Sequence, residues 1–329
     1  MASFAKFGND LYTGKLSFDF VGKYRVWYAI AAVLLTACVV IPIVRGGFVF
    51  GIEFRGGSQF QISNSQNLDQ GLAARTVTGV VADADPRVTT VGSSPASLQI
   101  QTSQLSNEQN TAVRNALADA FGVAEKDVTS SFIGASWGAD ITGQAIRGLL
   151  IFIVLAALVM ALYFRTWKMS VAAMVSLFHD LILTAGVYGI LQFEVTPAAV
   201  IGFLTILGYS LYDTVVVFDK IRENTSEGGR PFAESVNLAV NQTLVRSINT
   251  SVVAILPVGA ILFIGTVLLG AGTLRDISLA LFIGILAGTY STIFIATPLY
   301  AQLRSHEPEI LKEDKRILAA RQASASAQA

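Results

Sequence analysis

Ionisable residues interrupt the most apolar parts of this sequence, and Asp213 is the clearest case. It lies in the stretch "GYSLYDTVVVFDKIREN" over 208–224, whose first half is apolar enough for lipid. A carboxylate at membrane depth costs about 2.5–3.5 kcal/mol on insertion scales. Its short side chain would start roughly 9 Å from the nearer membrane surface, near Asp219, at a rise of about 1.5 Å per residue. The position therefore predicts a functional acid that faces the interior of a helix bundle.

A second polar group lies in an earlier apolar run. Ser176, Asp180 and Thr184 are spaced by four residues, which places them on one face of a helix, and His179 is beside them. Such groups mark ion or proton pathways in membrane proteins. They also form structural hydrogen bonds between helices. Both interpretations of Asp180 and His179 stay open at this point.

A later apolar run begins with a cation. Arg246, Asn249 and Thr250 share one helix face in the segment "RSINTS". A long cationic side chain near a helix end often reaches back to the headgroups. An arginine at this depth can also pair with a buried acid such as Asp213. Both interpretations of Arg246 stay open at this point, and Asp180, His179, Asn249 and Thr250 are candidates for a secondary polar site.

The motif "FGIEFRGG" over 50–57 lies between an apolar run and a polar segment. Gly56 and Gly57 favour a tight turn or bulge. If the motif is extended, Glu53 and Arg55 are two residues apart and point to one side. We expect a structural role for this motif.

These residues must be positioned by membrane helices. Only 14% of the 329 residues are charged, against about 25% in an ordinary soluble domain. Six apolar windows are long enough to cross a bilayer, and none carries the charged outer face of a soluble core helix. They cover residues 26–44, 144–164, 169–191, 198–218, 246–269 and 277–300.

The distribution of Lys and Arg predicts the orientation. With the N-terminus inside the cell, the inner segments 1–25, 165–168, 219–246 and 301–329 hold four, two, four and five basic residues. The short outer loops, 192–197 and 270–276, hold only Arg275. Basic residues are enriched in cytoplasmic loops. We therefore expect both termini in the cytoplasm and the long segment after the first helix outside.

This long segment is polar enough to fold in water. Strand-like and helix-like patterns alternate along it in the order β-α-β-β-α-β, with a hairpin around "SSPA" at 93–96. One helix begins at Ser106 with the spacing of a capping box and ends at Gly122. The order predicts a ferredoxin-like domain.

The predicted fold class is thus a polytopic α-helical membrane protein with six transmembrane helices. One extracytoplasmic α+β ferredoxin-like domain lies between the first two. A short amphipathic helix is expected after Pro231. The predicted parts are a cytoplasmic N-terminal segment (1–25), the first transmembrane helix (26–46), the outer domain (47–142), a five-helix bundle (143–302) and a cytoplasmic, largely disordered tail (303–329).

Several function classes lack support in the sequence. It contains no HExxH and no P-loop, so we expect neither an enzyme nor a metal or other cofactor site. The formal net charge is zero, which gives no indication of a nucleic-acid partner. Cys38 is the only cysteine and cannot form an intrachain disulfide. An energy-coupled protein of this kind would have to use an ion gradient.

Four motifs together resemble the SecF family. They are "FGIEFRGG" at 50–57, "LFHD" at 177–180, "GYSLYDTVVVFDKIREN" at 208–224 and "RSINTS" at 246–251. SecF is the smaller partner in the bacterial SecDF protein-export complex, which is related to the resistance-nodulation-division transporters. The resemblance spans residues from about 18 to 303. Glu53 stands where the family more often has Asp.

The resemblance implies a subunit in the bacterial cytoplasmic membrane that uses the proton motive force to promote late steps of protein export. It implies SecD, the SecYEG channel, membrane proteins of the YajC/YidC type, the translocating unfolded polypeptide and protons as partners. Asp213 and Arg246 match the family's proton-linked pair. Two alternatives remain: a proton-driven exporter of small molecules or lipids, and a scaffold of the translocase that moves no protons.

Overall fold

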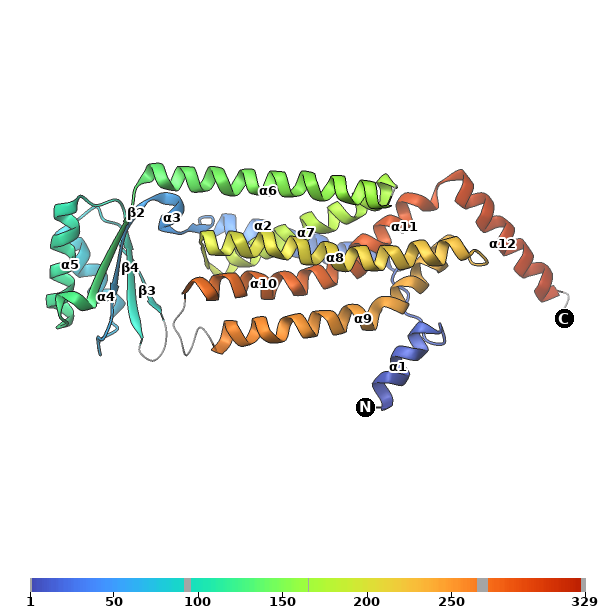
Figure 1. Ribbon diagram of the computed structural model, residues 1–329, viewed down its shortest axis with the longest axis horizontal. Coiled ribbons are helices and arrows are strands. Elements are labelled where there is room, and N and C mark those ends of the chain that lie inside the picture. The colour runs from blue at the N-terminus through green and yellow to red at the C-terminus, as the bar shows by residue number, and fades with distance from the viewer. Residues whose placement is uncertain (1, 92–95, 165, 265–271, 327–329) are drawn as a thin grey trace.

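The computed structural model describes residues 2–91, 96–164, 166–264 and 272–326. Long helices lie side by side in a bundle, and a small β-sheet domain lies at one end of it (Figure 1). Both chain termini lie at the opposite end, beside α1 (Ala2–Tyr12) and α12 (Pro308–Ser326). The bundle therefore separates the domain from the termini, as the sequence pattern requires.

Within the described residues, six helical segments are long and apolar enough to span a membrane. They correspond to the six predicted windows, and the protein is a multi-pass membrane protein. The helices are α2 (Tyr24–Val44), α6 (Ala135–Phe164), α7 (Trp167–Leu191), α8 (Pro197–Glu227), α9 (Phe232–Ala260) and α10 (Gly272–Ser291). The last span continues from α10 through a π-helical turn, η3 (Thr292–Ala296), into α11 (Thr297–Ser305).

Two helices extend well beyond the predicted windows. α8 continues to Glu227 and α9 already begins at Phe232, so residues 228–231 alone connect them. Gly228 and Gly229 have φ values of 70° and 79°, which favour glycine, and Pro231 is the N-cap of α9. The separate amphipathic helix expected after Pro231 is thus the first part of α9. Hydropathy falls where a helix leaves the lipid, but its backbone hydrogen bonds continue.

The β-sheet domain has the predicted element order. Its elements are β2 (Gly57–Ile62), α4 (Gln70–Val80), β3 (Arg87–Val91), β4 (Ser97–Thr102), α5 (Asn107–Phe121), the 3₁₀ turn η1 (Glu125–Asp127) and β5 (Val128–Ile133). The sheet order is β3-β4-β2-β5, and every neighbouring pair is antiparallel. The hairpin turn itself falls largely on residues 92–95, which lie outside the described residues.

The helix signals in this domain are confirmed. Ser106 and Gln109 form both hydrogen bonds of a capping box, and Gly122 ends α5 in the left-handed conformation. One face of the sheet packs against α4 and α5 around Phe60, Ile100 and Leu117. This apolar core holds the sheet together without help from the bundle.

The motif "FGIEFRGG" joins the domain to the bundle and is not an extended strand. It forms the short strand β1 (Val49–Phe50), the helical turn α3 (Ile52–Arg55) and the glycines before β2. Because Ile52–Arg55 is helical, Glu53 and Arg55 do not share one side as expected. Gly57 has φ 147°, and a Cβ there would lie 2.4 Å from the carbonyl oxygen of Thr102. The close approach of two strands therefore explains this glycine.

The two central helices, α8 and α10, pack at very short distance. A Cβ on Gly284 would lie 2.2 Å from Ile206 Cγ1, and one on Gly288 would lie 3.0 Å from Ser210 Cβ. Small residues at helix contacts let backbones approach closely in membranes. This approach brings the polar residues of α8 next to those of α10.

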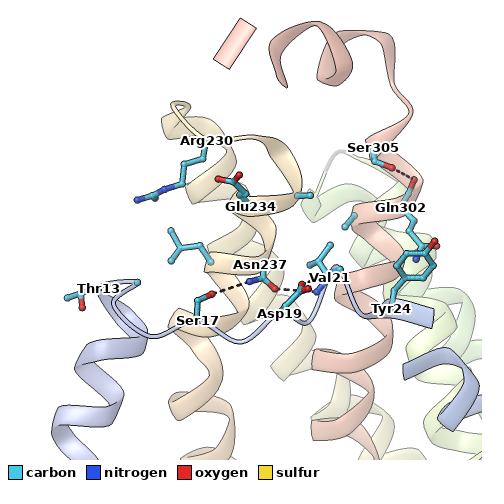
Figure 2. A pocket seen from close by; sticks show the side chains of 15 residues that line it. Thr13, Ser17, Asp19, Val21, Tyr24, Arg230, Glu234, Asn237, Gln302 and Ser305 are labelled. Carbon is cyan, nitrogen blue, oxygen red and sulfur yellow. Dashed lines mark hydrogen bonds between the residues drawn. The ribbon is translucent and has the colours of Figure 1, made fainter. Parts of the chain in front are cut away.

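The end of the bundle away from the domain is covered by chain from both termini. Asn237 and Asn241 of α9 bind the backbone of the segment 17–21, as Figure 2 shows for Asn237. A cavity of about 620 Å³ lies between this segment, α9 and α11. In α12, Asp314 accepts a hydrogen bond from the backbone N–H of Phe232.

The tail contains more helix than expected. α12 covers Pro308–Ser326, whereas the sequence pattern predicted a largely disordered tail from residue 303. The segment from Glu309 to Arg321 consists almost entirely of strong helix formers. Arg321 also forms an ion pair with Glu234 of α9 at 2.9 Å. Helix propensity and these contacts with α9 explain the difference.

Candidate functional site

Asp213 lies inside the bundle, with 7% of its surface exposed. Its Oδ1 accepts a hydrogen bond of 2.9 Å from Ser247 Oγ of α9. Its Oδ2 is buried and has no hydrogen-bonding partner among the described residues. A buried carboxylate with one satisfied and one unsatisfied oxygen is suited to gain and lose a proton.

Arg246 does not bind Asp213 directly, because neither carboxylate oxygen accepts a hydrogen bond from it. Its side chain is exposed and lines a cavity of about 420 Å³ with Tyr12, Asp219 and Lys220. This cavity lies at the end of the bundle where α1 packs. The charge of Arg246 still acts on Asp213 through space. The two predicted partners are thus neighbours on facing helices without forming an ion pair.

Asp180 of α7 lies beside the part of α8 that carries Asp213, and it is fully buried. Its Oδ2 accepts a hydrogen bond of 2.5 Å from Ser210 Oγ of α8, and its Oδ1 lies 3.2 Å from His179 Nδ1. His179 Nε2 and Thr184 Oγ1 are buried without partners among the described residues. Ser210 precedes Asp213 by less than one helical turn. α8 therefore presents Ser210 to α7 and Asp213 to α9.

Hydroxyl groups of α10 and η3 extend this polar layer. Ser176 donates to Ser291 at 2.8 Å, and the hydroxyls of Thr214 and Thr292 lie 2.9 Å apart. Polar side chains that bond across helices stabilise bundles in lipid. The two buried acids therefore lie among hydroxyl groups contributed by α7, α8, α9 and the segment of α10 and η3.

Asn249 and Thr250, which were predicted to belong to a polar site inside the bundle, do not lie on the buried face of α9. Asn249 is exposed, and Thr250 only bonds back to the carbonyl oxygen of Arg246. The buried polar face of this helix is instead formed by Thr243, Ser247 and Ser251. Their spacing of four is visible in the sequence, and it could have identified Ser247 as a partner of Asp213.

The motif residues Glu53, Arg55, Gly56 and Gly57 lie at the junction with the sheet domain, away from Asp213. Glu53 is half-buried and Arg55 is exposed. No group of three or more His, Cys, Asp or Glu side chains could hold a metal ion in the part of the chain that is described. What the two buried acids can do chemically is accept and release protons inside the bundle.

Comparisons with known proteins agree on one family. The family model "Protein export membrane protein SecD/SecF, C-terminal" matches residues 112–306. The protein translocase subunit SecF of Streptomyces coelicolor is 42% identical over 326 residues, which cover 98% of this chain and 86% of the relative. The protein translocase subunit SecDF of Thermus thermophilus is 32% identical over 288 residues, or 86% of this chain and 38% of that protein.

A solved structure has the same fold. The crystal structure of SecDF from Thermus thermophilus, a translocon-associated membrane protein, matches with a TM-score of 0.76 and 29% identity. The match covers 88% of this chain, which spans 39% of the SecDF chain. The resemblance found in four short motifs thus extends over nearly the whole sequence. The chain belongs to the SecF family of protein translocase subunits.

Proposed function

We propose that this chain acts in protein export as the partner of a SecD subunit, and that it uses the proton motive force to promote late steps of translocation through the Sec channel. The observation that supports this most directly is Asp213, a buried acid with one unpartnered oxygen inside a membrane bundle. Its polar surroundings offer a role in proton transfer. We therefore propose a transport subunit rather than an enzyme.

The proposed orientation places the bacterial cytoplasmic membrane around the bundle. The β-sheet domain has the strand order of a ferredoxin-like fold and lies outside, and both termini lie in the cytoplasm. The cavity beside Arg246 then faces the cytoplasm. Asp213 would exchange protons with this inner side through the cavity. It would exchange them with the outer side past the hydroxyl groups that surround the two buried acids.

The proposed cycle depends on the charge of Asp213. When its carboxylate is neutral, its attraction to Arg246 is lost, and α8 and α9 are free to rearrange. When the proton leaves toward the cytoplasm, the charge returns and Arg246 is attracted again. One charge that crosses the full potential contributes about 2.3 kcal/mol per 100 mV. This is comparable to the few kcal/mol that separate conformers of switching proteins.

Partners follow from the relatives. In Thermus thermophilus the matched region is part of a longer SecDF protein, so we propose that a separate SecD chain supplies the remainder here. The SecYEG channel, YajC/YidC-type proteins, the emerging unfolded polypeptide and protons complete the proposed partners.

The test is substitution of Asp213 in vesicles that contain SecD and the Sec channel. Asp213→Asn should assemble normally and lose the stimulation of export by an imposed proton gradient, because it imitates a permanently neutral acid. Arg246→Ala should also fail, whereas Arg246→Lys keeps the charge and should retain some activity. Asn249→Ala, exposed on the same helix as Arg246, is the matched control and should export normally.

The result separates the alternatives. If Asp213→Asn vesicles still respond to the proton gradient, the acid is only a structural link between α8 and α9 and the chain is a scaffold. If the chain moves small molecules or lipids without SecD, it is an exporter of the same superfamily.

Orientation has its own test. In a Cys38→Ser background, single cysteines at Thr89 in β3 and at Ser226 in α8 should label from opposite sides of intact cells, because both positions are exposed at opposite ends of the molecule. Labelling of both from outside would contradict the orientation.

A further inference from the structure

Three buried oxygens without hydrogen-bonding partners lie where the sheet domain meets the bundle. They are Glu53 Oε2 of α3, Gln101 Oε1 of β4 and Glu194 Oε1 of the short strand β6 (Glu194–Val195), and the statement concerns the described residues. β6 follows α7 and pairs with β1, so each oxygen comes from a different element. Buried polar atoms of native proteins normally have partners, so the cluster requires an explanation.

The two carboxylates converge on one glycine. A Cβ on Gly51 would lie 2.3 Å from Glu53 Oε2 and 3.3 Å from Glu194 Oε1. Gln101 has only 5% of its surface exposed, and its side chain interacts with Glu194. The two carboxylate oxygens are both acceptors, so neither can satisfy the other unless a proton is present.

The charges around the cluster are mixed. Burial raises the pKa of Glu194, and the negative charges of Glu53 and Asp276 raise it further, while the Gln101 amide and Arg87 oppose this rise. Arg87 comes from β3, and Asp276, itself paired with Arg275, comes from α10. The net direction is upward, so Glu194 holds a proton more readily than an exposed glutamate does.

We infer that Glu194 carries a proton, that it donates this proton in a hydrogen bond to Glu53, and that this bond fastens the sheet domain to the bundle. A proton on one carboxylate becomes a donor to the other, which gives both unpartnered acidic oxygens a hydrogen bond. Loss of the proton leaves two negative charges beside each other at a buried contact. The inference goes beyond the proposed function and does not require that Asp213 carries protons.

The strand contact across the junction is short enough for one proton to matter, although α3 also packs against α6, where a Cβ on Gly138 would lie 2.6 Å from the carbonyl oxygen of Phe54. β1 and β6 pair over two residues only, and Gly51 adds one backbone hydrogen bond of 3.0 Å to Val195. The domain has an apolar core of its own. Repulsion between Glu53 and Glu194 would therefore separate the domain from α7 and α8 rather than unfold it.

The test measures the position of the domain in the full chain and does not use export. Spin labels at Thr89 of β3 and Leu191 of α7, both exposed, report the distance across the junction in a Cys38→Ser background. We expect a narrow distance distribution at low pH and a broader, longer one at high pH. Glu194→Gln should give the narrow distribution at both, and Glu53→Gln provides a second variant if the first does not fold.

The control is Glu125→Gln, which removes an exposed acid of the same domain and should keep the pH dependence of the unsubstituted chain. Thermal unfolding adds a second measurement. Because the pKa of Glu194 is raised in the folded state, stability should fall as pH rises from the ordinary pKa of glutamate to the raised one. Glu194→Gln should lose this part of the slope.

Two results would overturn the inference. One is a distance distribution that does not change with pH, or one that changes equally in Glu194→Gln. The other is a distribution that responds to sodium concentration at constant pH, which would assign the three oxygens to a metal cation instead of a proton. Because no readout depends on a proton gradient, a failure here leaves the test of Asp213 unaffected.

Discussion

Asp180 and Asp213 differ in how completely their oxygens are satisfied, and this difference separates their roles. Both oxygens of Asp180 have partners, Ser210 and His179, whereas Asp213 has Ser247 alone. A satisfied buried acid holds helices together, and an unsatisfied one responds to protons. We therefore propose a structural role for Asp180 and proton transfer for Asp213.

This assignment predicts the effect of removing one hydroxyl. Ser210→Ala leaves Asp180 Oδ2 without its donor inside the bundle and should lower stability by about 1–3 kcal/mol. Thermal unfolding in detergent measures the change. Thr205→Ala, on the exposed side of the same helix, is the matched control and should change little. If Ser210→Ala in an Asp180→Asn background costs as much as Ser210→Ala alone, the bond between the two is not what stabilises the bundle.

The burial of Asp213 could be predicted from the sequence, but its hydrogen-bonding partner Ser247 could not. Asp213 is conspicuous because it is charged within an apolar run. Ser247 and Ser210 are neutral, and their role depends on how α8 crosses α9 and α7. The spacing along one helix carries no information about that crossing. The sequence therefore favoured Arg246, the nearest opposite charge, where the structure has a hydroxyl.

At the scale of elements, α9 is both a membrane helix and the binding surface for the N-terminal segment. Asn237 Oδ1 accepts hydrogen bonds from the backbone N–H groups of Phe20 and Val21, and its Nδ2 donates to Phe18 O and to Ser17 Oγ (Figure 2). An asparagine can satisfy an extended backbone in this way because it carries both donors and an acceptor. The N-terminal segment is thus fixed to the end of the bundle opposite the sheet domain.

The prediction for this element concerns local opening. Asn237→Ala should release the segment over 17–21 and increase hydrogen exchange at Phe20 and Val21 by about tenfold or more, which corresponds to about 1.4 kcal/mol. The rest of the bundle should keep its protection. Asn249→Ala on the same helix removes an exposed amide and is the control. Unchanged exchange at Phe20 would show that Asn241 and the apolar contacts hold the segment without Asn237.

Hydropathy and periodicity in the sequence predict the membrane helices but not where the helices begin and end. The six apolar windows were confirmed as helices because lipid requires uninterrupted apolar runs. The extensions of α8 to Glu227 and of α9 back to Phe232 carry charged and polar residues that no hydropathy window includes. The helical turn Ile52–Arg55 was not predicted, because a four-residue helix has no periodicity to detect.

The whole molecule has a face that its own helices do not cover. Along α8, Thr205, Gly208 and Tyr212 are exposed at helical spacing. Polar groups and a bare glycine are poor neighbours for lipid, but small residues are typical where membrane helices meet. Since the chain spans 39% of the matched SecDF structure, this face is where we expect SecD to pack.

The corresponding prediction places a large side chain on that face. A Cβ on Gly208 meets nothing within 4 Å, so Gly208→Trp should fold and melt like the unsubstituted chain. Its indole ring would occupy the space of a partner helix, and co-purification with SecD should therefore be lost. Leu158→Trp places the same ring on α6, where the leucine is already 53% exposed, and should retain SecD. Equal retention by both variants would move the interface away from α8, and loss in both would indicate that any added ring in the membrane disturbs assembly.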